Sequence, residues 1–180
     1  MSLLQSITRP AEGEFHPYFG LYIDQVPGGD ALACLREQEP RIRELASRFP
    51  ADREQFRYAE GKWSAREVVG HMIDTEAVFG FRALWFARGA EAGFPGMEQD
   101  DWARESNAHE RPMADLGADM LRARQSSLGL FEGLDESALL RQGTSDGGPL
   151  SVRATAWILA GHYIHHEVVL AEHYLGACRA

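Results

Sequence analysis

The sequence predicts an all-α protein built as a four-helix bundle. After residue 30, apolar residues recur at helical spacing in four long stretches, and clusters of glycine and proline separate these stretches. No strand-like alternation of apolar and polar residues persists. The chain has 180 residues, of which 44% are hydrophobic and 25% charged, which is the size and composition of one domain. We therefore expect a single four-helix-bundle domain over residues 1–180.

The first long helix is expected to follow an irregular amino-terminal segment, residues 1–29. This segment is rich in glycine and proline, and we expect it to wrap the bundle. Asp30 is a suitable N-cap for a helix that should end near Pro50. Pro40 lies inside that stretch and should kink or split the helix, because proline removes a backbone hydrogen bond.

The second long helix has the clearest start. Ser64 and Glu67 have the spacing of a capping box, and the helix should run to about Arg88. A loop of some two dozen residues follows, from Gly89 to Arg111, with one short helical turn over residues 101–106. Loops of this length in compact domains are often functional, so we expect this one and the second helix to enclose a cavity at the functional site that stays open to solvent.

The third and fourth long helices complete the bundle. Pro112 opens the third helix, which should close around Gly133, and a short turn, DESALLRQ, follows it. The segment GTSDGGPLS indicates a break in the helical pattern. Ser151 then caps the fourth helix, which should continue to about Gly176.

Composition limits the function classes. A formal charge of −9 argues against non-specific nucleic-acid binding, which depends on lysine and arginine. The apolar runs are far too short to span a bilayer, and the amino terminus does not resemble a signal peptide, so we expect no membrane partner and a cytoplasmic protein. Cys34 and Cys178 form no motif, which fits a reducing compartment. The expected partner is a small molecule or another protein.

Histidines from two helices are expected to point into the core. At about 100° per residue, His162 and His166 lie roughly 40° apart, within the apolar stripe of the fourth helix. His71 lies on the apolar stripe of the second helix. On the same projection, His165 falls at the boundary of the charged face and His173 points inward near the helix end.

A divalent metal would satisfy these buried imidazoles. Residues four apart on a helix can reach one ion while a third ligand comes from a facing helix, and three protein ligands leave a position for water or substrate. The alternative is that the histidines are core residues hydrogen-bonded to Thr, Tyr or water. His16 and His109 lie in irregular segments and are expected at the surface.

Other candidate residues are less specific. Arg82 also falls on the inward face of the second helix, where it could bind an anionic substrate or form an ion pair. Trp85, Phe86 and Tyr163 could line a pocket or belong to the core. No phosphate-binding loop, GxSxG elbow or HExxH motif is present, so the sequence identifies no nucleophile.

Three stretches of the chain resemble the DinB-like (damage-inducible) superfamily. They are GKWSAREVVGHMIDTEAVFGFRALWFARG, FPGMEQDDW and GGPLSVRATAWILAGHYIHHEVVL, and the likeness extends over residues 20–175. The resemblance implies a four-helix bundle of the DinB/YfiT-like type. It also implies a divalent metal held by His71, His162 and His166, with nickel or zinc first and iron or manganese as alternatives.

The resemblance further implies a reaction class. Relatives include mycothiol-dependent maleylpyruvate isomerases and bacillithiol S-transferases, so we expect a metal-activated low-molecular-weight thiol and transferase or isomerase chemistry on a small molecule. A metal-hydroxide hydrolase needs the same ligands and stays open. A non-catalytic metal- or ligand-binding protein of a stress response is the third possibility. The family likeness also implies a homodimer.

Overall fold

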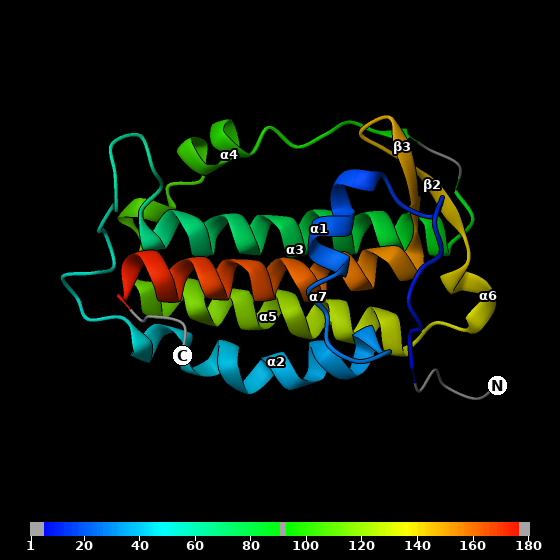
Figure 1. Ribbon diagram of the computed structural model, residues 1–180, viewed down its shortest axis with the longest axis horizontal. Coiled ribbons are helices and arrows are strands. Elements are labelled where there is room, and N and C mark those ends of the chain that lie inside the picture. The colour runs from blue at the N-terminus through cyan, green and yellow to red at the C-terminus, as the bar shows by residue number, and fades with distance from the viewer. Residues whose placement is uncertain (1–5, 91–92, 177–180) are drawn as a thin grey trace.

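Four long helices lie side by side in the computed structural model, which describes residues 6–90 and 93–176 (Figure 1). They are α2 (Ala31–Leu45), α3 (Ala65–Ala87), α5 (Met113–Glu132) and α7 (Val152–Val169). Helix α3 packs against α5 and α7, and α2 packs against the same two helices. The four long helices are those expected from the sequence.

The predicted helix starts are confirmed at three caps. The side chain of Asp30 accepts a hydrogen bond from the backbone N–H of Leu32 at the start of α2. Ser64 and Glu67 form the reciprocal capping box of α3. The Ser151 hydroxyl accepts from the N–H of residue 154 at the start of α7. Local side-chain hydrogen bonds therefore fix where three of the four long helices begin.

The prediction that Pro40 would split the first helix is wrong. Helix α2 is helical on both sides of Pro40 and ends at Leu45, where a 3₁₀ turn, Ala46–Arg48, follows. The backbone carbonyl of Arg36 loses its i+4 donor to the proline, but Arg36 is exposed, so water can replace that donor. The buried side chains of Leu35 and Ile42 hold the helix against its neighbours.

A small three-stranded sheet at one end of the bundle shows that the purely all-α prediction is wrong (Figure 1). It consists of β1 (Gly93–Phe94), β2 (Gln142–Ser145) and β3 (Gly148–Ser151), with β1 parallel and β3 antiparallel to β2. A two-residue turn of Asp146 and Gly147 joins β2 to β3, and both residues have positive φ, 53° and 73°. Asp-Gly strongly favours this hairpin turn, whereas the sequence analysis predicts only a break in the helical pattern here.

Short helical elements occupy the connections. Besides the 3₁₀ turn Ala46–Arg48, they are a 3₁₀ turn (Pro17–Phe19), α1 (Gly20–Ile23), α4 (Gln99–Glu105), a further 3₁₀ turn (Ala108–Glu110), α6 (Glu136–Leu139) and a π-helical turn (Leu170–Tyr174). Helix α1 packs on α7, so part of the amino-terminal segment expected to be irregular is helical. Helix α4 and the chain before it pass over α3 (Figure 1).

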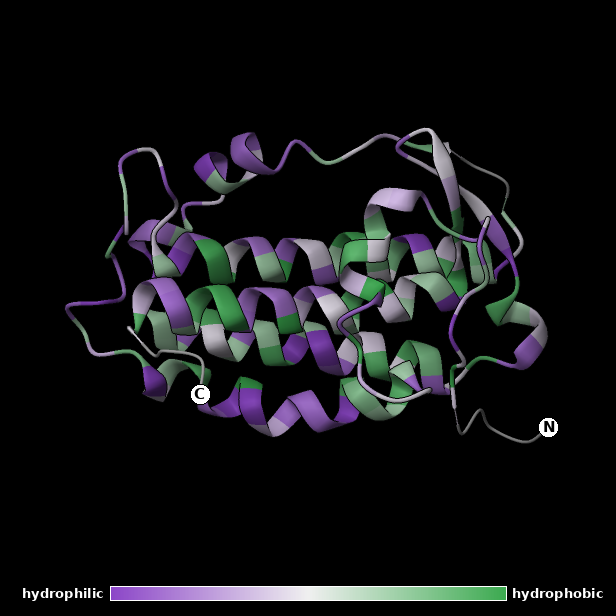
Figure 2. Cartoon of the chain, in the orientation of Figure 1, coloured by the Kyte–Doolittle hydropathy of each residue, from purple (hydrophilic) through white to green (hydrophobic). Residues whose placement is uncertain are grey.

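Hydrophobic residues lie on the inner faces of the long helices, whereas hydrophilic residues cover α4 and the outer face of α2 (Figure 2). The core forms two clusters, one containing Trp157 and the other Met113 and Met120. Within the described residues, no helix has both the length and the apolar character needed to cross a membrane. Cys34 is buried in α2, and Cys178 lies outside the described residues.

Gly161 allows α1 to approach α7 closely. A Cβ at this position would lie 1.9 Å from the carbonyl oxygen of Tyr22, which is backbone and cannot rotate away. We expect Gly161→Ala to lower the free energy of unfolding by about 1–3 kcal/mol, because the backbone of α1 must shift. Urea unfolding measures the effect. In the matched variant Gly129→Ala, the new methyl meets nothing within 4 Å, so stability should stay the same or rise. Equal effects in the two variants would contradict the close packing of α1.

Candidate metal centre

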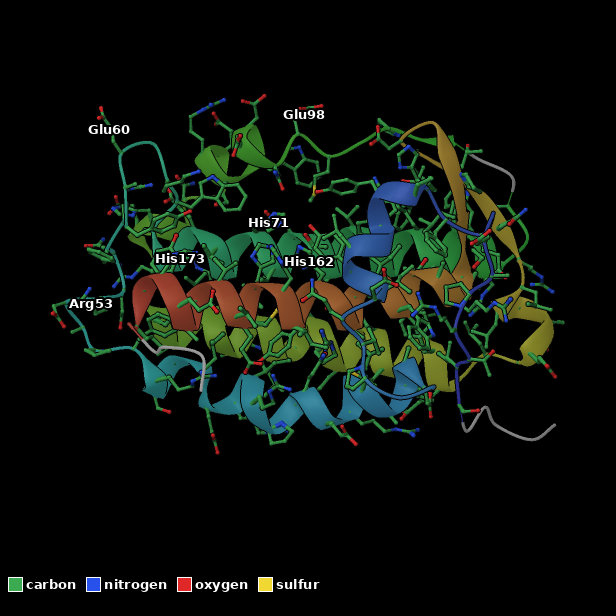
Figure 3. All side chains as sticks on the ribbon, viewed as in Figure 1. Arg53, Glu60, His71, Glu98, His162 and His173 are labelled. Carbon is green, nitrogen blue, oxygen red and sulfur yellow. The ribbon has the colours of Figure 1, made fainter. Side chains whose placement is uncertain are left out.

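Three buried histidines meet between α3 and α7. His71 comes from α3 and His162 and His166 come from α7, and their ligand atoms all lie within 4.8 Å of one another. The Nε2 atoms of His71 and His162 are 3.0 Å apart. Figure 3 shows these two side chains beneath the segment that carries Glu98. The structure thus brings together the three histidines selected from the sequence.

The helices position these rings by simple geometry. His162 and His166 are one turn apart on the buried face of α7, and their ring centroids are 4.4 Å apart. The ring of His71 lies 5.0 Å from each of the other two and 4.9 Å from the indole of Trp63, measured between ring centroids. Trp63 directly precedes the Ser64 cap, so the capped start of α3 carries one wall of the cluster.

Burial keeps the three imidazoles uncharged. Desolvation lowers the pKa of His71 to about 4, although the charge of Asp100 opposes the shift. Desolvation also lowers the pKa of His162 and of His166 well below the usual value, and the neighbouring histidines add to the effect. At neutral pH the site therefore presents three neutral nitrogen donors, the form in which histidine binds metal.

The lowered pKa of His71 predicts acid sensitivity of the metal-free protein. Between about pH 6.5 and about pH 4 the unfolded state binds the proton and the folded state does not. The contribution of His71 to the free energy of unfolding is therefore fully present above about pH 6.5. It is lost as the pH falls toward 4, and the loss is on the order of 3 kcal/mol. Urea unfolding of chelated protein across this range measures the loss. The variant His71→Gln should show a shallower dependence, and an equal dependence would contradict the burial argument.

The residues present fit a divalent metal. Two nitrogen ligands about 2.1 Å from one ion lie about 3.0 Å apart at a right angle and about 3.4 Å apart at a tetrahedral angle. The His71–His162 separation of 3.0 Å is at the short end of this range. The Nδ1 atom of His166 is buried and has no hydrogen-bond partner among the described residues. Such an atom in a core of neutral imidazoles is costly, since an unsatisfied buried polar group costs about 1–3 kcal/mol. The donor set suits zinc, nickel, iron or copper.

His165 of α7 and His173 of the π-helical turn that follows it do not join the cluster. His165 is half-buried, with its ring against Tyr22 and His166, as its boundary position predicted. The prediction that His173 points inward is wrong, because His173 is exposed and stacks on Tyr58 at 4.6 Å. The chain is π-helical at this point, so the projection of a regular α-helix no longer gives the correct face.

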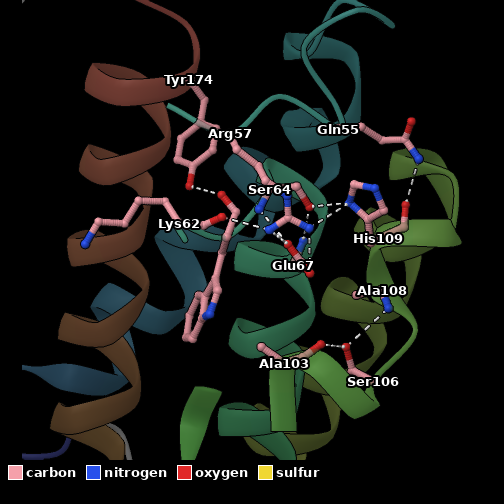
Figure 4. A network of polar contacts seen from close by, with 11 residues as sticks. Gln55, Arg57, Lys62, Ser64, Glu67, Ala103, Ser106, Ala108, His109 and Tyr174 are labelled. Carbon is pink, nitrogen blue, oxygen red and sulfur yellow. Dashed lines mark hydrogen bonds and ion pairs between the residues drawn. The ribbon is translucent and has the colours of Figure 1, made fainter. Parts of the chain in front are cut away.

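His16 and His109, expected at the surface, are both half-buried. The Nδ1 atom of His109 lies 3.0 Å from the hydroxyl of Ser64, within a network that includes Arg57 and Glu67 (Figure 4). Ser64 is fully buried, and its hydroxyl also accepts the capping bond of α3. This serine–histidine pair therefore stabilises the start of α3 and does not resemble a catalytic dyad.

A cavity of about 490 Å³ adjoins the cluster and is lined by His71 and His162. Residues 96–101, from the loop between α3 and α5, form its roof, as expected for this loop. The side chains of His16, Tyr18, Phe19, Tyr22 and Phe79 form an aromatic wall. None of the three aromatic residues proposed from the sequence lines this cavity: Phe86 and Tyr163 are in the core, and Trp85 is exposed.

Arg82 lines the same cavity and is buried. Its Nη2 donates a hydrogen bond to the carbonyl oxygen of Pro95 at 2.7 Å, which ties α3 to the roof segment. Its guanidinium carbon lies 4.9 Å from the centre of the Phe79 ring. Burial lowers the pKa of Arg82, and the charge of Asp146 opposes that shift. The inward position is as predicted, and substrate binding by Arg82 stays a prediction.

Thr75, Tyr22 and Asp100 are among the cavity-lining residues that sequence analysis did not propose. Thr75 follows His71 by four positions on the same stripe, and this spacing was a usable signal. Tyr22 and Asp100 come from the amino-terminal segment and the long loop, and no periodic pattern there indicated where they would lie.

Comparison with solved structures identifies similar folds. YfiT from Bacillus subtilis, described as "a probable metal-dependent hydrolase with an unusual four-helix bundle topology", matches with a TM-score of 0.65 and 15% identity over 94% of each chain. YjoA, a DinB-like protein from Bacillus subtilis, matches with a TM-score of 0.55 and 19% identity over 83% of this chain and 93% of that one. At these identities the likeness shows the fold, and it supports the four-helix bundle. The search of curated proteins gives no match.

The sequence also matches the family model of the DinB superfamily over residues 35–167. This stretch contains α3 and nearly all of α7, and with them the three clustered histidines. The chain belongs to the DinB superfamily.

Proposed function

We propose that this protein is a divalent-metal-dependent enzyme that acts on a small molecule. His71, His162 and His166 hold the metal, and nickel or zinc is the first choice, with iron or manganese as alternatives. The observation that carries the proposal is that two of the three histidines also line a cavity of about 490 Å³. That volume lies within the range of small-molecule sites. A bound metal supplies Lewis-acid activation of a thiol or of water.

Thiol transfer or thiol-dependent isomerisation is the first candidate reaction. Three neutral imidazoles leave the full charge of a divalent ion available to favour a thiolate over a thiol. The cavity offers space for an electrophile beside the histidines, bounded by Phe79 and Tyr22. The chain's own contribution is to bind that electrophile and to shield the site from bulk water.

Hydrolysis is the second candidate, and Asp100 is the residue that favours it. Asp100 lies in the cavity roof, close enough for its charge to influence His71. A carboxylate there could accept a proton from water during hydrolysis. The similar fold of YfiT, described as a probable metal-dependent hydrolase, agrees with this candidate. A non-catalytic role in a stress response is less well supported, because a purely structural ion needs no adjoining cavity.

A homodimer remains our prediction for the assembly. Phe81, Leu84 and Trp85 are large exposed apolar residues on α3, and a second copy could cover them. Light scattering of wild type and Phe81→Glu tests this prediction. A concentration-dependent dimer that is lost in the variant supports it, and a monomeric wild type contradicts it. We further expect the protein to act in the cytoplasm.

Activity measurements separate the two candidate reactions. Metal-loaded protein is incubated with 1-chloro-2,4-dinitrobenzene and cysteine, and separately with 4-nitrophenyl acetate without thiol. Metal-dependent thiol conjugation that survives Asp100→Asn supports transfer. Metal-dependent ester hydrolysis that is lost in Asp100→Asn supports the hydrolase. Neither activity above the metal-free control, across a wider panel of thiols and esters, would contradict the enzyme proposal.

A further inference from the structure

The aromatic wall of the cavity forms a continuous chain of rings. Tyr18 contacts Phe19 at 5.6 Å and Tyr22 at 6.1 Å between ring centroids. Phe19 contacts Phe79 at 5.6 Å, and Tyr22 lies 5.1 Å from His162. All are edge-to-face contacts, and Tyr18 at the outer end is 54% exposed. The rings therefore lead from the molecular surface to the histidine cluster.

This wall is suited to a flat apolar group. Aromatic rings gain about 0.5–1.5 kcal/mol from edge-to-face or offset contacts beyond the burial of area. The wall is built from three separate elements that meet at the cavity. The 3₁₀ turn contributes Phe19, α1 contributes Tyr22 and α3 contributes Phe79. A planar ring entering past Tyr18 would contact these residues on its way to His162.

The charge of the cavity disfavours anions. Arg82 and four acidic residues, Glu98, Asp100, Asp101 and Asp146, make up its charged lining. The negative charge of Asp146 partly offsets the positive charge of Arg82. Arg82 also already donates a hydrogen bond to the backbone carbonyl of Pro95. Glu98 points away from the histidines, but its charge remains beside the cavity (Figure 3). The metal of the proposed function would add positive charge only at the histidine end. An anion approaching past Tyr18 therefore meets a negative roof.

Thr75 lines the cavity and carries a buried hydroxyl. Its side chain is 2% exposed, and its hydroxyl has no hydrogen-bond partner among the described residues. It lies one helical turn after His71 and lines the same cavity. A buried hydroxyl without a partner costs free energy, and a ligand with a polar end near His71 would satisfy it after a rotation about χ1.

We propose that the cavity binds an uncharged or cationic aromatic molecule, with its ring on the wall of Phe19, Tyr22 and Phe79 and its polar end toward Thr75 and His71. This inference rests on the proposed function and names its substrate class. Polyanionic substrates are disfavoured by the same arrangement.

Four probes of related shape test the inference by calorimetry: 2-phenylethylamine, 2-phenylethanol, 3-phenylpropionate and n-butylamine. The full chain is used after chelation, with its helix content confirmed, so that no probe gains affinity by coordinating metal. We expect the aromatic amine and alcohol to bind at least about tenfold more tightly than phenylpropionate, and butylamine to bind at least about tenfold more weakly than phenylethylamine. Tightest binding by phenylpropionate, equal binding of the two amines, or no binding of any aromatic probe would overturn the inference.

Two pairs of variants localise the binding. Tyr18→Ala should weaken phenylethylamine binding by about three- to tenfold, because Tyr18 packs edge-on against Phe19 and Tyr22 of the wall. Tyr58→Ala, which changes a tyrosine outside the cavity lining, should not weaken it. Thr75→Val should weaken the binding of phenylethanol, and the midpoint of unfolding should stay the same or rise. Thr8→Val should not change the binding of phenylethanol. Equal effects within either pair would overturn the placement. These binding measurements need no metal. A negative result therefore rejects the aromatic ligand without rejecting the metal-dependent function, and a protein that binds no metal can still bind the aromatic probes.

Discussion

Replacing His162 by alanine is expected to lower the affinity for Zn²⁺ or Ni²⁺ by at least about 100-fold, because one of three ligands is lost and changes to residues supporting a ligand already cost 10–100-fold. Metal-dependent activity should fall with it. Metal content by plasma mass spectrometry on untagged protein, followed by competition titration with a chromogenic chelator, measures the change. His71→Ala and His166→Ala should behave in the same way.

His173→Ala is the matched control for these variants. His173 lies only seven residues after His166 in the sequence, but it is exposed and outside the cluster. Its loss should therefore leave the affinity for metal unchanged. A His162→Ala protein that retains near-stoichiometric metal would show that the ion binds elsewhere. Loss of metal in His173→Ala would contradict the assignment of the three ligands.

A second large effect is expected at the buried ion pair of Glu76 and Arg124. The carboxylate of Glu76 accepts two hydrogen bonds from the guanidinium of Arg124, at 2.8 and 3.0 Å, and both side chains are almost fully buried. Arg124 also donates to the amide oxygen of Gln38, whose Nε2 donates to the carbonyl oxygen of Ala160 at 2.9 Å. We expect Glu76→Gln to lower the free energy of unfolding by about 3–5 kcal/mol, because a buried cation loses its partner.

An exposed pair provides the comparison. Glu132 binds Arg36 at the surface, with 44% and 46% of the side chains exposed, and Glu132→Gln should cost about 1 kcal/mol or less. The double variant Glu76→Met with Arg124→Met should be more stable than either single Met variant, because no charge is left buried alone. Urea unfolding measures all these proteins. Equal losses in Glu76→Gln and Glu132→Gln would contradict the role of the buried pair.

Helical periodicity explains how the three candidate ligands could be selected from the sequence. His162 and His166 are one turn apart on an apolar stripe, and His71 lies on the stripe of another long capped helix. Wherever an α-helix is regular, residue spacing fixes the direction of a side chain. The same projection failed at His173, because a π-helical turn changes the angle per residue.

The rest of the site depends on connections that have no periodic pattern. Tyr22 reaches the cavity because α1 packs on α7 at Gly161, a contact between residues far apart in the sequence. The roof over His71 is held by Arg82 and by β1 pairing with β2, which are long-range contacts as well. The Asp146–Gly147 hairpin was predictable from local turn chemistry, and only the parallel pairing with β1 was not.

The metal-edge X-ray absorption spectrum of the protein as purified shows directly whether the three histidines bind a metal. We predict one divalent metal per chain with three imidazole nitrogens at about 2.0–2.2 Å and one or more further ligands, such as water oxygens, completing the shell, reduced to two imidazoles or lost in His166→Ala. A spectrum with only oxygen ligands, or protein that takes up no metal on reconstitution at neutral pH, would show that these histidines are not a metal centre.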